Sequence, residues 1–232
     1  MKICGIQKTT LIDYPGQIAC TLFLFGCNFR CGFCHNPELV LGENKNEISQ
    51  ESVLEFLLKR RGQLEGVCIT GGEPLLNIEK DFLRKIKDMG YKIKLDTNGS
   101  FPERLKDLID SGLIDYVAMD IKITPEKYSE LVNYSVDIDK LEESIKLISG
   151  LENYEFRTTV IEGIHTQEEI RSMFNWLLSI CPKPKKFVFQ GFKNYGKFVD
   201  KSFKLKKDTS DCYLKSLRKS MKNSFDEVEI RV

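Results

Sequence analysis

The sequence lacks long apolar segments and has no excess of charge of either sign. No apolar run reaches the roughly 18 residues that a membrane-spanning helix needs. The chain has 35 basic and 34 acidic residues, for a net charge of +1. The first residues show neither the apolar core nor the small-residue cleavage site of a signal peptide. We therefore expect a cytoplasmic protein that binds neither membrane nor nucleic acid.

Internal repeats and low-complexity linkers are also absent. The chain has 232 residues, of which 41% are hydrophobic and 30% are charged, as in ordinary globular proteins. We expect one domain over residues 1–232. Within it, residues 1–17 form an irregular or hairpin lead-in, residues 18–191 form the core, and residues 192–232 add a helix and a strand.

From residue 18 on, strand-like segments alternate with amphipathic helical ones. The expected strands cover residues 18–25, 66–70, 91–96, 116–121, 154–160, 186–191 and 227–232. The expected helices lie near residues 50–61, 78–89, 102–111, 125, 138–149, 166–179 and 210–220. Such alternation implies a parallel sheet, because each helix returns the chain to the same edge. The prediction is an α/β fold, an incomplete (β/α)6 barrel with parallel strands, whose ligands bind beyond the carboxyl ends of the strands.

Three cysteines lie close together after the first of these strands. Cys27, Cys31 and Cys34 have the spacing C-x3-C-x2-C, and the aromatic Phe33 precedes the third. Three thiolates can bind three corners of a 4Fe–4S cluster and leave the fourth iron open. A structural zinc site completed by His35 is an alternative, although zinc sites usually present two separated ligand pairs. A disulfide plus a spare thiol is a third, but nothing indicates an oxidising compartment.

The other five cysteines show no metal-like spacing: Cys4, Cys20, Cys68, Cys181 and Cys212. Cys20 and Cys68 fall inside expected strands, where we predict buried, small apolar side chains. Nine lysines gather between residues 183 and 207. They suit a solvated face or, alternatively, a docking edge for a partner or an electron donor.

Polar motifs follow several of the expected strands. Gly71-Gly72-Glu73-Pro74 would let a ligand approach the backbone closely and would offer a carboxylate to a ligand ammonium group. Asp96-Thr97-Asn98 leads into Gly99 after the next strand. Both segments are also compatible with ordinary turns.

Charged side chains also occur within the later strands. Asp120 and Lys122 alternate, so they share one side of their strand and could bond a carboxylate and sugar hydroxyls; an exposed ion pair is the alternative. Arg157 and Gln190 lie on the next two strands, where polar groups among apolar residues need partners. We interpret His165 as a surface residue outside the site.

Together these motifs resemble the radical S-adenosylmethionine (SAM) superfamily, whose signature is C-x3-C-x-aromatic-C with a Gly-Gly-Glu motif for the amino group of SAM. Four segments further resemble the glycyl-radical-enzyme activating proteins, most of all the anaerobic ribonucleoside-triphosphate reductase activating group. They are the lead-in over residues 7–16, the Cys-His-Asn-Pro of residues 34–37, the Asp-Thr-Asn-Gly of residues 96–99 and the Asp-Ile-Lys of residues 120–122. One departure concerns the related pyruvate formate-lyase activators, which have a SAM-contacting histidine near the sixth strand. Here that stretch begins with Gln190.

The resemblance implies a radical SAM oxidoreductase that cleaves SAM reductively and makes a glycyl radical on a partner enzyme. It implies a cluster on the three cysteines, an external one-electron reductant such as flavodoxin or ferredoxin, and no general acid or base. The residues implied to contact SAM come from the strand ends: Gly71, Gly72, Glu73, Pro74, Asp96, Thr97, Asn98, Asp120, Lys122, Arg157 and Gln190. Three alternatives remain: a radical SAM enzyme for a small molecule such as a modified-nucleobase precursor, an activator of a pyruvate formate-lyase type enzyme, and a non-catalytic metal-binding module.

Overall fold

The structure is a computed structural model that describes residues 1–42 and 47–232. Its contacts divide the chain into two compact units. Unit one comprises Met1–Asn28, Asn36–Thr97 and Glu103–Val117, and unit two comprises Phe29–His35, Asn98–Pro102 and Ala118–Val232. The single domain expected from the sequence stays a prediction. Among the described residues, no helix has both the length and the apolar character needed to cross a membrane.

Unit one is built on four strands: β1 (Ile3–Thr10), β2 (Ala19–Leu24), β3 (Gly66–Gly71) and β4 (Lys92–Thr97). They lie in chain order, with β1 antiparallel to β2 and the others parallel. The lead-in therefore contributes one strand, β1, which pairs with the first strand of the expected core. Cys20 and Cys68 are fully buried, as predicted.

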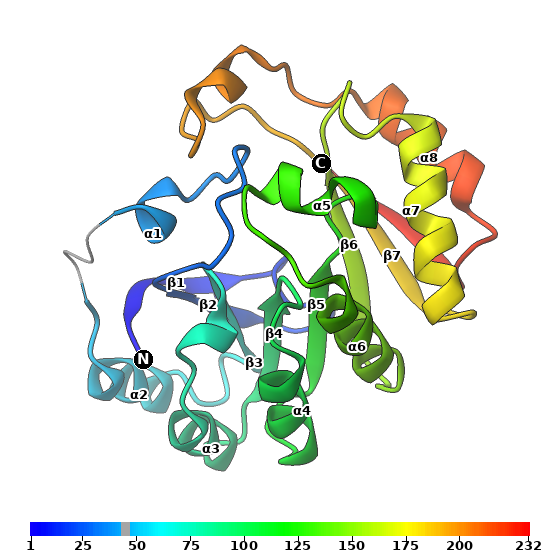
Figure 1. The fold of residues 1–232 in the computed structure, drawn as a ribbon. Coiled ribbons are helices and arrows are strands. Elements are labelled where there is room, and N and C mark those ends of the chain that lie inside the picture. Colours follow the sequence, from blue (N-terminus) through cyan, green and yellow to red (C-terminus); the bar gives the residue numbers. More distant parts are fainter. Residues whose placement is uncertain (43–46) are drawn as a thin grey trace. The chain divides into compact units, whose positions relative to one another are not determined.

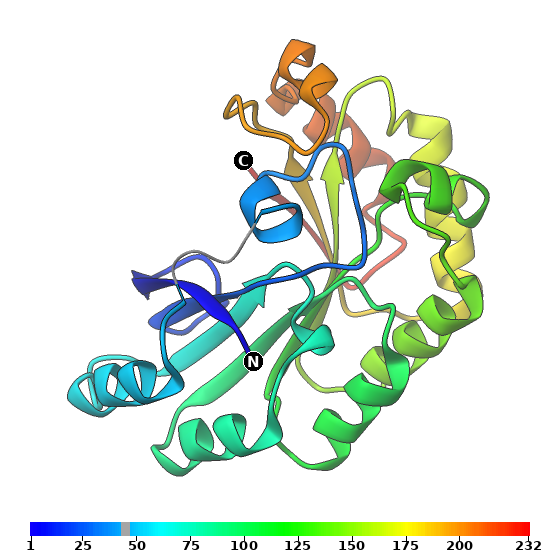
Figure 2. The same ribbon diagram turned by 60° about the vertical axis from the view of Figure 1, so that its left-hand side comes forward.

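The helices of unit one follow the strands: α1 (Pro37–Val40), α2 (Gln50–Lys59), α3 (Lys80–Asp88) and α4 (Pro102–Asp110), with a 3₁₀ turn, η1 (Pro74–Leu76). Helix α2 is capped by Ser49, whose hydroxyl accepts a hydrogen bond from the Ser52 amide at 3.1 Å. Figures 1 and 2 show α2 and α3 on the same side of β3 and β4. The buried faces of these helices carry apolar residues such as Leu57 and Ile86.

Strand β5 (Tyr116–Asp120) begins in unit one and ends in unit two. Just before it, in unit one, Asp115 donates its amide to the Ile93 carbonyl of β4 at 2.8 Å. Just after it, in unit two, the Ile121 amide donates to the Arg157 carbonyl at 2.8 Å. The residues on either side of β5 are therefore each bonded to a strand of their own unit.

Unit two contains the parallel strands β6 (Tyr154–Val160), β7 (Lys186–Gly191) and β8 (Glu227–Arg231). Its helices are α5 (Pro125–Val132), α6 (Ile138–Ser149), α7 (Gln167–Ile180) and α8 (Asp211–Met221), with a 3₁₀ turn, η2 (Lys201–Leu205). Figure 1 shows α7 and α8 beside these strands.

The strands of unit two have one apolar and one charged face. Phe187 and Phe189 pack on Phe174 of α7, with ring centroids 4.6 and 5.7 Å apart. Burial of each such ring contributes about 1.5–3 kcal/mol to stability. The opposite face carries Glu155 and Arg157 of β6, which alternate with Phe156, the residue in register with Phe187. Charges on a buried face require partners, and these partners form part of the candidate site.

The predicted element order is confirmed, and each predicted strand ends within one residue of the observed strand. The fold is α/β with a largely parallel sheet, as expected for the predicted class. The structure adds β1 as an antiparallel strand, and β8 continues the parallel set beyond the six expected core strands. The short helix α1 and the two turns η1 and η2 were not predicted.

Candidate functional site

The base of the cysteine loop in unit one packs directly against the Gly-Gly-Glu turn. The Glu73 amide donates to the Gly26 carbonyl at 2.8 Å, and Gly26, which precedes Cys27, has a φ of +94°. A Cβ atom at Gly72 would lie 1.9 Å from the Gly26 oxygen. Position 72 therefore requires glycine, because the two backbone segments touch there.

Glu73 is almost fully buried, with an exposed fraction of 1%. Its Oε1 accepts hydrogen bonds from the Leu75 amide at 3.0 Å and from the Thr97 hydroxyl at 2.9 Å. Pro74 occupies the first position of η1, where its missing amide proton costs nothing. Glu73 therefore links the end of β3 to the end of β4. The sequence analysis predicted only a contact with SAM for this residue and missed its structural role.

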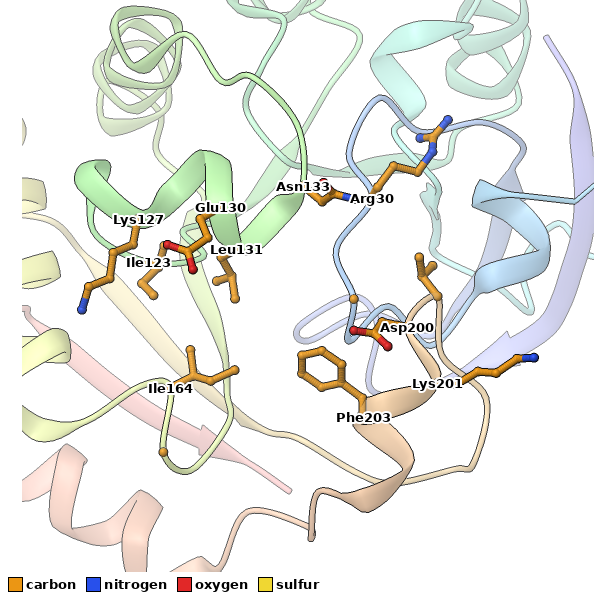
Figure 3. A pocket seen from close by; sticks show the side chains of 13 residues that line it. Arg30, Ile123, Lys127, Glu130, Leu131, Asn133, Ile164, Asp200, Lys201 and Phe203 are labelled. Carbon is orange, nitrogen blue, oxygen red and sulfur yellow. The ribbon is translucent and has the colours of Figure 1, made fainter.

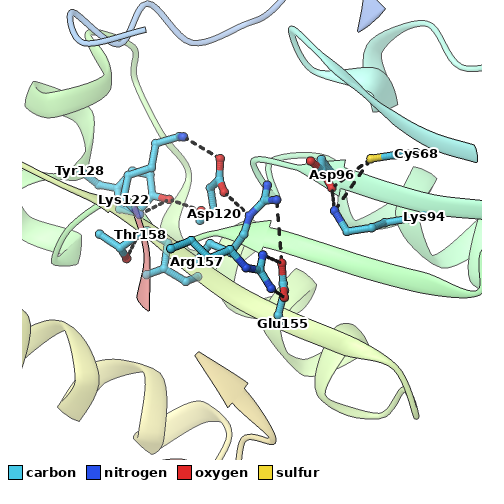
Figure 4. Close-up of polar contacts among 11 residues, drawn as sticks. Cys68, Lys94, Asp96, Asp120, Lys122, Tyr128, Glu155, Arg157 and Thr158 are labelled. Carbon is cyan, nitrogen blue, oxygen red and sulfur yellow. Dashed lines mark hydrogen bonds and ion pairs between the residues drawn. The ribbon is translucent and has the colours of Figure 1, made fainter. Parts of the chain in front are cut away.

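Asp96 forms an ion pair with Lys94, a buried residue that the sequence analysis did not single out (Figure 4). The Cys68 sulfur lies 3.9 Å from both the Lys94 ammonium and the Asp96 carboxylate. A buried ammonium group needs such partners. The sequence could have indicated this pair, because Lys94 and Asp96 are two positions apart on an apolar strand and therefore lie on the same side.

Cys31 and Cys34 lie in unit two, where the Cys34 amide donates to the Cys31 carbonyl at 3.0 Å. Burial raises the pKa of the Cys31 thiol, and the nearby Lys122 charge offsets part of that effect. A buried thiol of this kind ionises when it binds a metal centre. The donor chemistry of the loop therefore suits iron or zinc.

His35 is anchored through one ring nitrogen, an arrangement that a zinc-bound histidine also shows, so the choice of metal rests on the geometry of the thiols. Its Nε2 donates to the Lys193 carbonyl at 2.7 Å, and its ring contacts Phe192, Tyr195 and Phe198. Within the described part of the chain, no three Cys, His, Asp or Glu side chains converge on a single ion. The thiolates of a 4Fe–4S cluster bind different iron atoms and need not converge. The residues therefore fit a cluster better than a zinc ion completed by His35.

Asp120, Lys122 and Arg157 form a charged group in unit two (Figure 4). Arg157 Nε donates to Asp120 Oδ1 at 3.0 Å, and Lys122 Nζ lies 3.3 Å from Asp120 Oδ2. Burial would raise the pKa of Asp120, but the Arg157 and Lys122 charges hold it below its usual value. The prediction that Asp120 and Lys122 share one side is confirmed. The alternative of an ion pair is correct in kind, but the pair is partly buried, with Lys122 14% and Asp120 31% exposed.

His165 supports this group, and its interpretation as a surface residue is wrong. It is fully buried. Its Nδ1 accepts the Ile161 amide at 2.9 Å, so the ring proton is on Nε2, which donates to the Lys122 carbonyl at 2.8 Å. Burial also lowers the pKa of His165 and keeps the ring neutral. The Tyr128 hydroxyl also holds this segment: it donates to the Asp120 carbonyl and accepts from the Lys122 amide, each at 3.2 Å.

Asn98 and Gln190 occupy strand ends in unit two. The Asn98 side chain accepts hydrogen bonds from the Ser100 amide at 3.0 Å and the Ser100 hydroxyl at 2.6 Å, as in an ordinary turn. Gln190 lies in register with Thr159 of β6 and Arg231 of β8. The predicted contacts of Asn98 and Gln190 with SAM stay predictions.

Within each unit, the structure brings together a subset of the predicted site residues. Unit one gathers Glu73 with Thr97 and the Gly71-Gly72 turn. Unit two gathers Asp120, Lys122 and Arg157. The assignment of all these residues to SAM or cluster binding stays a prediction.

A cavity of about 890 Å³ lies beside the cysteine loop in unit two (Figure 3). Apolar side chains form much of its wall, from the segment after β5, helix α5, the loop after β6 and η2: Ile123, Leu131, Ile164 and Phe203. Gly32 of the cysteine loop also lines it, and the polar side chains are those of Arg30, Lys127, Glu130, Asn133, Asp200 and Lys201. The cavity has room for a sizeable substrate group or a short polypeptide segment.

Both the sequence and the fold of this chain are similar to those of known proteins. Residues 21–177 match the family model of the radical SAM superfamily. A protein of Methanocaldococcus jannaschii, named "Putative glycyl-radical enzyme activating enzyme", is 32% identical over 99% of this chain and 95% of its own length. A pyruvate formate-lyase-activating enzyme of Clostridium pasteurianum is 34% identical over 52% of each chain.

Among solved structures, SuiB of Streptococcus suis bound to S-adenosylmethionine has a TM-score of 0.67 and 16% identity. The match covers 90% of this chain and 51% of SuiB, and at this identity it shows likeness of fold alone. This chain thus spans nearly all of the Methanocaldococcus relative, but about half of the clostridial enzyme and of SuiB.

Proposed function

Since this chain belongs to the radical SAM superfamily, we propose that it is an activating enzyme that makes a glycyl radical on a partner protein. Enzymes of this superfamily use a 4Fe–4S cluster and SAM. The observation that carries the proposal is the similarity to the Methanocaldococcus protein over almost the full length of both chains. The shorter matches to pyruvate formate-lyase-activating enzymes support the same reaction class.

We assign cluster binding to Cys27, Cys31 and Cys34. When bound, the cluster and SAM supply a 5′-deoxyadenosyl radical by one-electron cleavage of the sulfonium, and this radical takes a hydrogen atom from the substrate. The electron comes from an external reductant such as flavodoxin or ferredoxin. The protein's own part is to hold the reactants and to keep water from them.

The residues at the strand ends bind and orient SAM in this proposal. Gly72 holds the turn against the backbone of the cysteine loop, and Glu73 offers a carboxylate to the amino group. In unit two, Lys122 supplies a positive charge for the SAM carboxylate, and Asp120 accepts from sugar hydroxyls. Arg157 keeps Asp120 ionised and fixed in place, because its Nε bonds the carboxylate. The remaining predicted contacts add to this set: Gly71, Pro74, Asp96, Thr97, Asn98 and Gln190.

The substrate in this proposal is a glycine in a polypeptide segment of the partner. The cavity beside Arg30 and Gly32 gives such a segment room next to the cysteine loop. Its apolar wall suits aliphatic side chains that flank the glycine. We propose anaerobic ribonucleoside-triphosphate reductase as the partner, on the resemblance of the lead-in and of the Cys-His-Asn-Pro segment.

The test combines the cluster-loaded protein with SAM, a one-electron reductant and the candidate reductase under anaerobic conditions. We expect a glycyl-radical doublet in the EPR spectrum of the reductase. Cys31→Ala should abolish the doublet, while Cys181→Ala, a buried thiol outside the motif, should retain it. A pyruvate formate-lyase type enzyme, tested in parallel, identifies the other partner class. Formation of 5′-deoxyadenosine without a radical on either, stimulated by a small molecule, would show that the substrate is not a protein.

A further inference from the structure

A row of alternating charges crosses unit two on the face of the strands opposite Phe187 and Phe189. Figure 4 shows its members Glu155, Arg157, Asp120 and Lys122. Arg231 of β8 donates two hydrogen bonds to Glu155 of β6, at 2.7 and 2.6 Å. Arg157 Nη1 lies 4.0 Å from Glu155 Oε1, and Arg157 Nε bonds Asp120. Lys122 completes the row on the far side of Asp120. Strand β8 is thereby connected to the charged group at the end of β5.

Glu155 is the critical member of this row because its side chain is completely buried. A buried carboxylate is stable only when cations and hydrogen bonds compensate its charge. Arg231 makes the two short contacts, and Arg157 stands at a distance where the attraction to Glu155 is still strong. Glu155 and Asp120 therefore compete for the guanidinium of Arg157, and Arg231 weakens the pull of Glu155.

We propose that Arg231 is a positioning residue for SAM binding: by engaging Glu155 it leaves Arg157 on Asp120. This inference rests on the proposed role of Asp120 in binding SAM. Without the Arg231 charge, Arg157 turns toward Glu155 and its Nε leaves the Asp120 carboxylate. Asp120 then loses the hydrogen bond that fixes its orientation toward the ligand.

A purely structural ion pair would behave differently. Loss of Arg231 would then lower stability, but every folded molecule would bind SAM as before. The double replacement separates the two cases, because Arg231→Met with Glu155→Gln removes the competing carboxylate charge together with the cation. Positioning predicts that SAM affinity returns in the double variant, since Arg157 is no longer attracted away from Asp120.

The experiment compares wild type, Arg231→Met, Glu155→Gln and the double variant, each as cluster-loaded protein. One readout is the Arg157 Nε–H signal in a ¹H–¹⁵N NMR spectrum, assigned with Arg157→Lys, which reports the bond to Asp120 without SAM. The other is the SAM dissociation constant. We expect Arg231→Met to shift the Arg157 signal and weaken SAM binding about ten-fold, and the double variant to restore both.

Lys87→Met is the control, because Lys87 bonds both carboxylate oxygens of Asp115 at 2.7 Å in unit one. It should lower stability and leave SAM affinity unchanged. If Arg231→Met behaves like this control while Asp120→Asn weakens SAM binding, the inference is overturned and the proposed SAM site stands. If Asp120→Asn also leaves SAM affinity unchanged, the assignment of Asp120 to SAM fails, and the inference fails with it.

Discussion

Replacement of Gly72 by alanine tests whether the cysteine loop and the Gly-Gly-Glu turn are packed backbone to backbone. The added Cβ would lie 1.9 Å from the Gly26 oxygen, so the two segments must separate by about 1.5 Å to reach an ordinary contact. That movement breaks the 2.8 Å hydrogen bond from the Glu73 amide to Gly26. Overpacking of about 1–3 kcal/mol and a lost hydrogen bond of about 1 kcal/mol together give about 2–4 kcal/mol.

The assay is anaerobic thermal unfolding of Gly72→Ala beside wild type, with iron content measured on the same samples. We expect a melting temperature lower by about 5–15 °C and less iron per chain. Gly150→Ala is the matched control, since Gly150 has a φ of −79° and an added Cβ would lie 3.5 Å from the Leu147 carbonyl oxygen, an ordinary contact. That control should change stability by less than about 1 kcal/mol. Equal melting temperatures for the two variants would refute the close backbone contact.

Three further predictions concern the cluster, SAM and pH. Cys31→Ala should abolish the iron–sulfur EPR signal after anaerobic reconstitution, whereas Cys181→Ala should retain it; stoichiometric zinc in place of iron would contradict the cluster. Glu73→Gln should weaken SAM binding about ten- to hundred-fold by calorimetry, with little change in melting temperature, because glutamine keeps an oxygen acceptor for the Leu75 amide. Burial lowers the pKa of His165, so the unfolded chain binds protons that the folded protein does not once the pH falls below about 6.5. The free energy of unfolding, measured in urea titrations, should therefore decrease toward pH 5, and it should decrease less steeply in His165→Gln. If the two proteins lose stability equally between pH 7 and pH 5, His165 does not cause the pH dependence.

The strands and the sidedness of their residues were predictable because both are local properties of the sequence. Apolar runs bounded by glycine, asparagine and proline fixed the strand ends to within one residue. Alternation correctly placed Asp120 and Lys122 on one side, where they form an ion pair. The same rule applied to the Tyr-Glu-Phe-Arg segment of β6 would have indicated Glu155 beside Arg157.

Contacts between distant parts of the chain could not be predicted in this way. Glu155 and Arg231 are separated by 76 positions, and only the strand order of unit two brings them together. His165 follows a strand in the sequence and resembles a surface loop residue, yet its ring is buried between two backbone groups. The structural bonds of Glu73 likewise depend on Thr97 of the neighbouring strand.

Deuterium transfer tests the proposed function most directly. The cluster-loaded protein would be incubated anaerobically with SAM, a one-electron reductant and a candidate glycyl radical enzyme whose glycines carry deuterium at Cα. Mass spectrometry of the 5′-deoxyadenosine then reports where its new hydrogen came from. The proposal predicts one deuterium in the 5′-methyl group, together with a glycyl radical on the partner. Unlabelled 5′-deoxyadenosine formed at an undiminished rate, with no radical on the partner, would contradict it.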